Sequence, residues 1–308
     1  MNKIVVIGTG GVGGYFGGRL ALAGNDVTFI ARGEHLKAMK EKGLRVKSVK
    51  GDFVIHPVKV THQLKEIEPP DLVILGVKAW QVKDLAMELK TIVKPETIVL
   101  PLQNGVLSPE ELISILNPQS VMGGSCRIFS KIESPGVIIH YGIEPMIIFG
   151  ELDHTTSERA QKLKIIFDDA GISSKISNDI QSELWRKLMV IASGGLLAIS
   201  RSTYGAVREQ KGTRQLMHDL LFEIYLVSQK AGATLEKDLV DQTMAYIDTY
   251  PYDASTSMAR DIWEGKPSEI EYQNGTIVAL GLKYGIDTPV NRFIYHSLLP
   301  MEIKARKN

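Results

Sequence analysis

The sequence of 308 residues contains a single cysteine, Cys126, so no disulfide can form within the chain. This count fits a reducing compartment, and we expect a cytoplasmic protein. We expect Cys126 to be a small buried residue, with a reactive thiol as the alternative. The charges show no excess of one sign, because 36 basic residues stand against 35 acidic residues. Nothing in this balance indicates a nucleic-acid or membrane partner.

Long apolar runs and the spacings of a metal site are missing as well. The most apolar later stretch, residues 188–199, is interrupted by Ser193, Gly194 and Gly195 and is shorter than the roughly 20 residues that span a bilayer. The first expected strand begins at residue 3, so we expect no signal peptide. None of the seven histidines stands in metal-ligand spacing with another. We therefore expect no metal site.

A glycine-rich loop follows an apolar run, Ile-Val-Val-Ile, at residues 4–7. The loop consists of Gly8, Thr9, Gly10, Gly11, Val12 and Gly13. In such a loop Gly8 permits a sharp turn, Gly10 lets the backbone approach a pyrophosphate, and Gly13 lets the following helix pack against the strand. We therefore expect a dinucleotide site at the helix N-terminus. Glycines at four-residue spacing also occur in paired membrane helices, but Arg19 and the short apolar stretch argue against that interpretation.

The second expected strand, residues 27–31, ends at Arg32. An NAD-specific site would carry an acidic residue near this strand end, to accept hydrogen bonds from the ribose 2′-hydroxyl. A guanidinium group suits a 2′-phosphate instead, so the sequence favours NADP(H) over NAD(H). His35 and Lys37 would add positive charge only weakly. The alternative is a solvated arginine at a strand end.

Two further apolar segments, residues 71–77 and 97–102, predict buried parallel strands. Lys78 follows the first and Asn104 follows the second. Ligands lie at the carboxyl ends of the strands in open α/β sheets, so we expect both residues on the cofactor side. A lysine or an Asn-Gly turn at a strand end is also common without any function.

The length suggests two domains, a Rossmann-type dinucleotide-binding domain over residues 1–178 and an all-helical domain over residues 179–308. We expect residues 121–127, 136–140 and 146–149 to form strands that finish the sheet. A helical pattern begins near residue 157, and no convincing strand follows residue 178.

Three polar residues of the second half are candidates for chemistry. Lys187 projects from an apolar helix face, where it is either a proton donor or a lysine whose head reaches water. Glu269 lies in Ser268-Glu269-Ile270-Glu271, which predicts a capping box opening a helix that ends near Gly285. The helix dipole alone could account for Glu269. Ser257 would otherwise pass as a helix-start serine.

Over nearly its whole length the chain resembles the ketopantoate reductase (2-dehydropantoate 2-reductase) family. The matching segments are the glycine loop, Arg32, Val77-Lys78-Ala79-Trp80-Gln81, Asn104-Gly105, Pro135-Gly136-Val137-Ile138-Ile139-His140, Leu184-Trp185-Arg186-Lys187, Ser257-Met258, Ser268-Glu269-Ile270 and Gln273-Asn274-Gly275. The resemblance implies a cytoplasmic, NADPH-dependent enzyme of pantothenate biosynthesis, a monomer or homodimer, that reduces a small 2-oxo acid in a cleft between two domains.

The resemblance also implies roles for single residues. Lys187 would be the general acid that protonates the ketone oxygen. Glu269 would hydrogen-bond the substrate hydroxyl and help to hold the Lys187 ammonium. Ser257 would receive the substrate carboxylate. Lys78 and Asn104 would lie by the nicotinamide ribose, with Asn104 also near the substrate.

Three asparagines that are usual in the family are replaced here by Ile191, Gly195 and Ala254. The resemblance implies ketopantoate, reduced to pantoate, as the substrate. We expect the substrate site to be more apolar, and roomier at Gly195, so a bulkier or less polar 2-oxo acid is the alternative. Further alternatives are a dehydrogenase acting on 3-hydroxy acids or opines, and a non-catalytic NADP-binding regulator. A regulator would have no reason to keep Lys187 together with Glu269.

Overall fold

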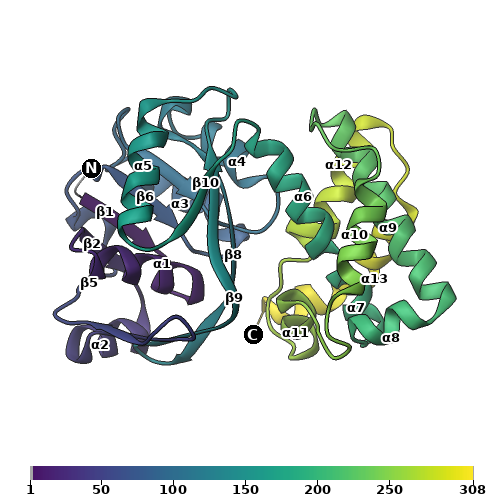
Figure 1. Ribbon diagram of the computed structural model, residues 1–308, viewed down its shortest axis with the longest axis horizontal. Coiled ribbons are helices and arrows are strands. Elements are labelled where there is room, and N and C mark those ends of the chain that lie inside the picture. The colour runs from purple at the N-terminus through teal and green to yellow at the C-terminus, as the bar shows by residue number, and fades with distance from the viewer. Residues whose placement is uncertain (1–2, 308) are drawn as a thin grey trace. The chain divides into compact units, whose positions relative to one another are not determined.

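The computed structural model describes residues 3–307. The chain forms two compact units, one made of the residues up to Gln103 with Ser108–Glu183, the other of Asn104–Leu107 with the residues from Leu184 onward. In Figure 1 the first unit runs in colour from purple to teal and the second continues to yellow. A Rossmann-type unit precedes a helical unit in the chain, so the predicted fold class is confirmed.

Within residues 3–307 all strands belong to the first unit. They are β1 (Lys3–Ile7), β2 (Asp26–Ile30), β3 (Leu44–Ser48), β4 (Phe53–Ile55), β5 (Lys59–Thr61), β6 (Leu72–Leu75), β7 (Ile98–Pro101), β8 (Gly123–Ser134), β9 (Val137–Gly150) and β10 (Ser173–Ile176). A parallel sheet has the order β5-β2-β1-β6-β7, with Ile7 in register with Ile30 and with Leu75. The loops that follow β1, β2 and β6 therefore leave from the same edge of the sheet.

Both faces of this parallel sheet are covered, which explains why its strands are nearly continuous apolar runs. Ile4 and Val6 belong to one buried core, together with side chains of the helix that follows the glycine loop. Val5 and Ile7 belong to the core on the opposite face. Cys126 is buried in the first of these cores, as expected for a small apolar residue.

The prediction that residues 121–127, 136–140 and 146–149 finish the parallel sheet holds only at its start, where Val121 forms a parallel bridge with Val99 of β7. The rest is wrong, because these segments continue into β8 and β9, which pair antiparallel in a second sheet where β9 belongs to the order β10-β9-β3-β4. Only Pro135 and Gly136 separate the two strands, and Gly136 has a φ of +76°. A two-residue connection can join only antiparallel neighbours, whereas the apolar pattern shows a strand without showing its partner.

Thirteen α-helices are described within residues 3–307. They are α1 (Gly11–Leu22), α2 (Gly33–Lys42), α3 (Val82–Leu89), α4 (Ser108–Ile113), α5 (Glu158–Asp169), α6 (Ile180–Ala192), α7 (Gly194–Ser200), α8 (Tyr204–Glu209), α9 (Lys211–Lys230), α10 (Leu239–Asp248), α11 (Ser257–Trp263), α12 (Thr276–Tyr284) and α13 (Pro289–Ala305). Shorter turns are η1 (Leu64–Glu66), η2 (Ala79–Gln81), η3 (Pro118–Ser120) and η4 (Glu271–Gly275), the last a π-helix. None of the helices in the described part of the chain combines the length and the apolar character needed to cross a membrane.

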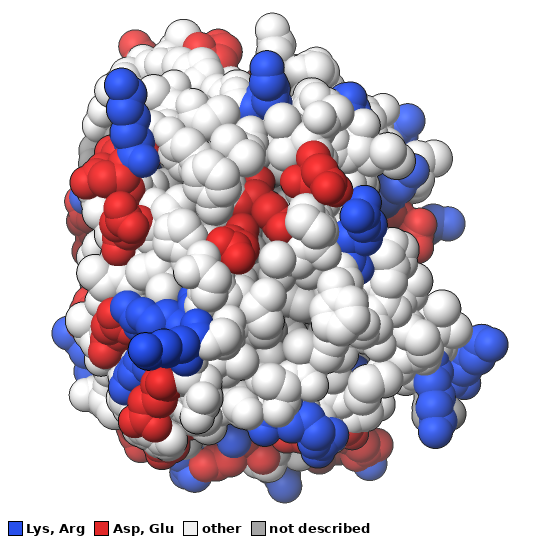
Figure 2. Space-filling model, turned by 90° about the vertical axis from the view of Figure 1, so that its right-hand side faces the viewer, with Lys and Arg blue, Asp and Glu red and all other residues white. Residues whose placement is uncertain are grey.

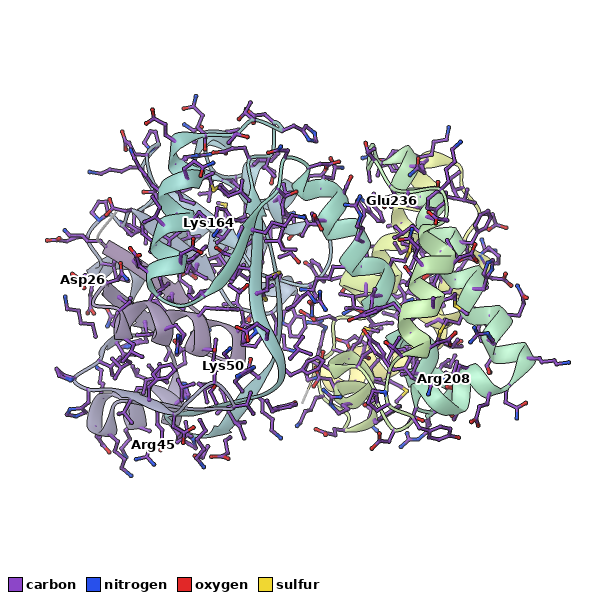
Figure 3. All side chains as sticks on the ribbon, viewed as in Figure 1. Asp26, Arg45, Lys50, Lys164, Arg208 and Glu236 are labelled. Atoms are coloured by element: carbon purple, nitrogen blue, oxygen red, sulfur yellow. The ribbon has the colours of Figure 1, made fainter. Side chains whose placement is uncertain are left out.

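Surface charge is mixed on the face that Figure 2 shows, where Lys and Arg side chains are interspersed with Asp and Glu. Charged side chains also fix local structure. Arg208 donates to the backbone carbonyls of Ile247 and Tyr250 and so closes the end of α10 (Figure 3).

The segment around Glu269 differs from the predicted capping box. The backbone N–H and the hydroxyl of Ser268 both donate to the carboxylate of Glu302 in α13, at 2.9 and 2.6 Å to Oε2. Ser268 is therefore held by a distant helix rather than by Glu271. A π-helix follows, in which the Gly275 N–H donates to the Ile270 carbonyl at 2.9 Å, and α12 ends before Gly285 as predicted.

Candidate active site

The glycine loop has the backbone geometry that its sequence predicts. Gly8 has a φ of +89°, and a Cβ added there would lie 2.6 Å from the Val77 backbone N. A Cβ added at Gly13 would lie 2.3 Å from the Gly8 carbonyl oxygen. The Thr9 hydroxyl donates to the Ile30 carbonyl at 3.0 Å and ties the loop to the end of β2. Only glycine fits at the turn and at the contact between α1 and the loop.

Gly10 and Gly11 differ sharply in their surroundings. A Cβ added at Gly10 would meet no heavy atom within 4 Å, whereas one added at Gly11 would lie 2.5 Å from the Ser130 carbonyl oxygen. Gly11 is thus required by the close approach of β8, a constraint that the sequence motif does not reveal. Open space at Gly10 together with the first turn of α1 fits a pyrophosphate group.

Arg32 and Lys78 lie at the same edge of the sheet as the glycine loop. Arg32 is exposed and directly precedes α2, one residue after Ala31 at the end of β2. Lys78 is exposed and precedes η2, and its Nζ lies 5.7 Å from the centre of the Trp80 ring. Sequence reasoning misses Gln103, whose buried amide donates to the carbonyls of Leu75 and Val77, at the end of β6 and just after it, at 2.8 and 3.0 Å.

His35 cannot serve as a source of positive charge in the way the sequence suggests. Its Nδ1 accepts a hydrogen bond from the Gly136 N–H at 3.0 Å, which requires an unprotonated Nδ1. Burial lowers the pKa of His35, an effect only partly opposed by a hydrogen bond with the Thr9 backbone. The neutral imidazole therefore joins α2 to the β8–β9 turn.

In the second unit the structure brings Asn104 and Glu269 together. The Asn104 side-chain amide donates to Glu269 Oε2 at 2.8 Å, and the Glu269 side chain is buried. Gly105 follows with a φ of +99°, and a Cβ there would lie 2.8 Å from the Tyr272 carbonyl oxygen. Asn104 follows β7 in sequence as predicted, but residues 104–107 pack with the helical unit.

Lys187 is half-buried in α6. Asp179 caps this helix by accepting from the Ser182 N–H at 3.0 Å. The neighbouring Arg186 forms a two-point ion pair with Glu236, labelled in Figure 3, and this pairing lowers the pKa of the Glu236 carboxyl. Arg186 thereby anchors the turn of α6 that carries Lys187.

Ser257 is exposed and is the first residue of α11. The capping residue of this helix is Thr256, whose hydroxyl accepts from the Ala259 N–H at 3.1 Å. The Ser257 hydroxyl is therefore not the one that caps the helix.

The expectation of extra room at Gly195 is wrong. A Cβ added at Gly195 would lie 2.4 Å from Asn274 Oδ1 and 2.8 Å from Ile294 Cγ2. The side chain of Asn274, which comes from the π-helix, fills the space beside Gly195. No pattern within α6 or α7 signals this contact. Ile191 and Ala254 are partly buried against the apolar core of the unit.

The first unit thus presents a glycine loop, a guanidinium and an ammonium at one sheet edge, which suits a phosphate-bearing dinucleotide. The second unit carries an ammonium, a buried carboxylate and its amide partner, groups that protonate an oxyanion or bind a hydroxyl. Among residues 3–307 no three His, Cys, Asp or Glu side chains are arranged to hold a metal ion.

A Rossmann-type sheet is a fold on which many proteins bind dinucleotides, and here a helical unit follows it. Residues 4–154 match the model of the family described as "Ketopantoate reductase PanE/ApbA", and residues 179–302 match its C-terminal model. The chain belongs to this family and is an oxidoreductase of it.

The chain is similar to relatives along its full length. It is 31% identical to 2-dehydropantoate 2-reductase of Nostoc sp., covering 96% of this chain and 94% of the relative. It is 29% identical to the uncharacterized oxidoreductase YkpB of Bacillus subtilis, covering 96% and 97%.

Solved structures agree with this assignment. The crystal structure of a PanE/ApbA family ketopantoate reductase from Ralstonia eutropha has a TM-score of 0.89 at 29% identity, with 99% of each chain covered. D-mandelate dehydrogenase, solved with NADH and anilino(oxo)acetate, has a TM-score of 0.88 and the same coverage. At 24% identity it shows a shared fold alone.

The packing at Gly195 can be tested by comparing two glycines of the second unit. We expect Gly195→Ala to lower the free energy of unfolding by about 1–3 kcal/mol, because the methyl group must displace Asn274 or Ile294. Gly212→Ala in α9 meets no heavy atom within 4 Å and should leave stability unchanged or raise it by up to about 1 kcal/mol. Urea unfolding of both variants gives the values. Equal stability of the two would contradict the close contact at Gly195.

Proposed function

We propose that the protein catalyses the NADPH-dependent reduction of a 2-oxo acid to a 2-hydroxy acid. The observation that carries the proposal is the Asn104–Glu269 hydrogen bond at 2.8 Å. Asn104 and Glu269 are distant in sequence and are both predicted site residues. The hydrogen bond brings the Asn104 amide to the buried Glu269 carboxylate. Lys187 lies in the same unit, and family membership supplies the reaction class.

The residues at the carboxyl edge of the first sheet fit a phosphorylated dinucleotide. Gly10 leaves open space before α1, and Arg32 offers an exposed guanidinium for a 2′-phosphate. Lys78 adds a second cation at this edge. When bound, reduced NADP supplies a hydride, that is, two electrons and one hydrogen nucleus, to the substrate carbonyl carbon.

The second unit supplies the proton and the positive charge that the carbonyl oxygen of the substrate requires. As the C=O bond becomes a C–O single bond, Lys187 donates a proton to the oxygen, and its ammonium charge stabilises the forming alkoxide. Glu269, held by Asn104, accepts a hydrogen bond from the substrate hydroxyl and attracts the Lys187 ammonium. Ser257, whose hydroxyl is not the helix cap, binds the substrate carboxylate.

Ketopantoate is the first substrate to test, because the Nostoc relative is named as 2-dehydropantoate 2-reductase. A less polar 2-oxo acid is a second candidate, favoured by the apolar side chains of Ile191 and Ala254. A panel of 2-oxo acids assayed with NADPH and NADH decides between them. Ordinary catalytic efficiency on ketopantoate would reject the second candidate.

The cofactor site is tested by a pair of glycine variants. Gly10→Ala has room for its methyl group, so we expect an unchanged unfolding midpoint with an NADPH affinity lowered at least about 10-fold by the methyl group at the pyrophosphate. Gly13→Ala, whose Cβ would lie 2.3 Å from the Gly8 carbonyl oxygen, should lose stability instead. Fluorescence titration and thermal unfolding measure both effects. Full NADPH affinity in Gly10→Ala would refute a pyrophosphate at this loop.

Cofactor preference is tested at Arg32. We expect Arg32→Ala to raise the KM for NADPH by about 10- to 100-fold, because a charge-assisted contact with the 2′-phosphate contributes about 1.5–3 kcal/mol. The KM for NADH should not change. Lys40→Ala is the control, because it removes an exposed charge from the last turn of α2, the helix that follows Arg32. An equal effect on the two cofactors would argue that Arg32 does not contact the phosphate.

The role of Lys187 is tested by Lys187→Ala. NADPH binding should persist while kcat falls by about 10²- to 10⁴-fold, the usual loss on removing a general acid. Lys230→Ala, at the exposed end of α9, is the control. Stopped-flow measurement of NADPH oxidation separates binding from turnover. An unchanged rate would remove the proposed mechanism.

A further inference from the structure

A chain of buried amide and carboxylate groups crosses the second unit. The Asn274 amide donates to the Ala192 carbonyl at 3.2 Å and to Asn291 Oδ1 at 2.9 Å. Asn291 in turn donates to Glu223 Oε2 at 2.7 Å and to the Leu220 carbonyl at 3.2 Å. Asn274 and Asn291 are completely buried, and Glu223 is 6% exposed.

The two ends of this chain differ in what they fix. Glu223 also accepts the backbone N–H groups of Val290 and Asn291, at 2.8 and 2.9 Å, which satisfies the first turn of α13. This end is structural, because it ties α9 to α13. Asn274 forms the other end, and it ties the π-helix to α6.

The elements joined by Asn274 carry both candidate catalytic groups. Ala192 is the last residue of α6 and follows Lys187 by about 7.5 Å along the helix axis. The last four carbonyl groups of a helix have no N–H partner within it, and the Ala192 carbonyl is one of these in α6. The Asn274 amide donates a hydrogen bond to this carbonyl. On the other side, Asn274 lies in the π-helix that begins two residues after Glu269, and the Gln273 N–H donates to the Glu269 carbonyl at 3.0 Å.

We propose that Asn274 is a positioning residue, which sets the separation of Lys187 and Glu269 by bonding the π-helix to the end of α6. One hydrogen of its amide bonds the end of α6, and the other bonds Asn291 in α13, which holds the amide in place. The π-helix adds one residue to a turn, and π segments are frequent at functional sites because they turn a side chain to a position that an α-helix cannot give it. Here the extra residue brings Asn274 against Gly195, with Oδ1 2.4 Å from the place of a Cβ.

Asn274 also occupies the space beside Gly195. The glycine at this position therefore creates no room for substrate.

The inference rests on the proposed reductase function and is tested with Asn274→Ala and Asn274→Asp in the full chain. Loss of the two donated bonds lets the helix end and the π-helix shift, and a misplacement of 1 Å near a reacting group can cost about 10²-fold in rate. We therefore expect kcat to fall by about 10- to 100-fold, with an increased solvent deuterium isotope effect as proton transfer becomes rate-limiting. The KM for NADPH should stay unchanged, because the glycine loop, Arg32 and Lys78 lie in the other unit and Asn274 has no hydrogen bond with Asn104.

Two further variants separate positioning from stability. Ser228→Ala removes a buried hydroxyl that bonds the Tyr225 carbonyl in α9, and it should lower stability without changing kcat or the isotope effect. Asn291→Ala removes one acceptor of the Asn274 amide and should lower kcat less than Asn274→Ala does. The kcat of the double variant should be no lower than that of Asn274→Ala alone, since the two residues act in one hydrogen-bond network. If Asn274→Ala does not fold, Asn291→Ala carries the comparison.

The possible outcomes are distinct. If none of the 2-oxo acids tested supports NADPH oxidation by the wild-type protein, the proposed function is refuted, and this inference with it. An active wild type whose Asn274 and Asn291 variants keep the kcat and isotope effect of the wild type, whatever their stability, refutes the positioning role alone.

Discussion

The buried carboxylate of Glu269 sets a requirement that the local structure must meet. A carboxylate that is 6% exposed is unstable unless donors replace the water it has lost. The Asn104 amide meets this need with a hydrogen bond of 2.8 Å. The next residue, Gly105, allows a close approach to the Tyr272 carbonyl oxygen, which would lie only 2.8 Å from a Cβ at this position. The short segment after β7 therefore packs with the helical unit, although the chain enters it from the sheet.

Comparison with other buried carboxylates of the second unit shows how the hydrogen-bond partner of Glu269 differs from theirs. Glu302 accepts from Ser268 and pairs with the Arg306 guanidinium at 2.7 Å, so a cation cancels its charge. Glu223 is bound by the first turn of α13. The donor from Asn104 is a neutral amide, which stabilises the Glu269 carboxylate without cancelling its charge. A carboxylate held in this way retains the capacity to attract an ammonium group or a hydroxyl hydrogen.

Features that depend on neighbouring residues could be predicted from the sequence, and features that depend on distant partners could not. Continuous apolar runs show the strands of the parallel sheet, and the glycine spacing shows the turn at Gly8 and the close packing at Gly13. The antiparallel pairing of β8 with β9 and the four-residue β10 escape such reasoning, since a pattern does not name its partner. The capping box at Ser268 fails for the same reason, because Glu302 competes from another helix.

The three positions at which the resemblance predicts asparagines differ in their surroundings. Beside Gly195 the space is occupied by the Asn274 amide, whose N–H groups are both donated to protein acceptors. No donor is left there for a substrate, so this position is closed rather than enlarged. Ile191, on the same helix face as Lys187, and Ala254 carry apolar side chains that remain partly exposed. Any difference in substrate preference should therefore arise at these two positions, through polarity rather than through size.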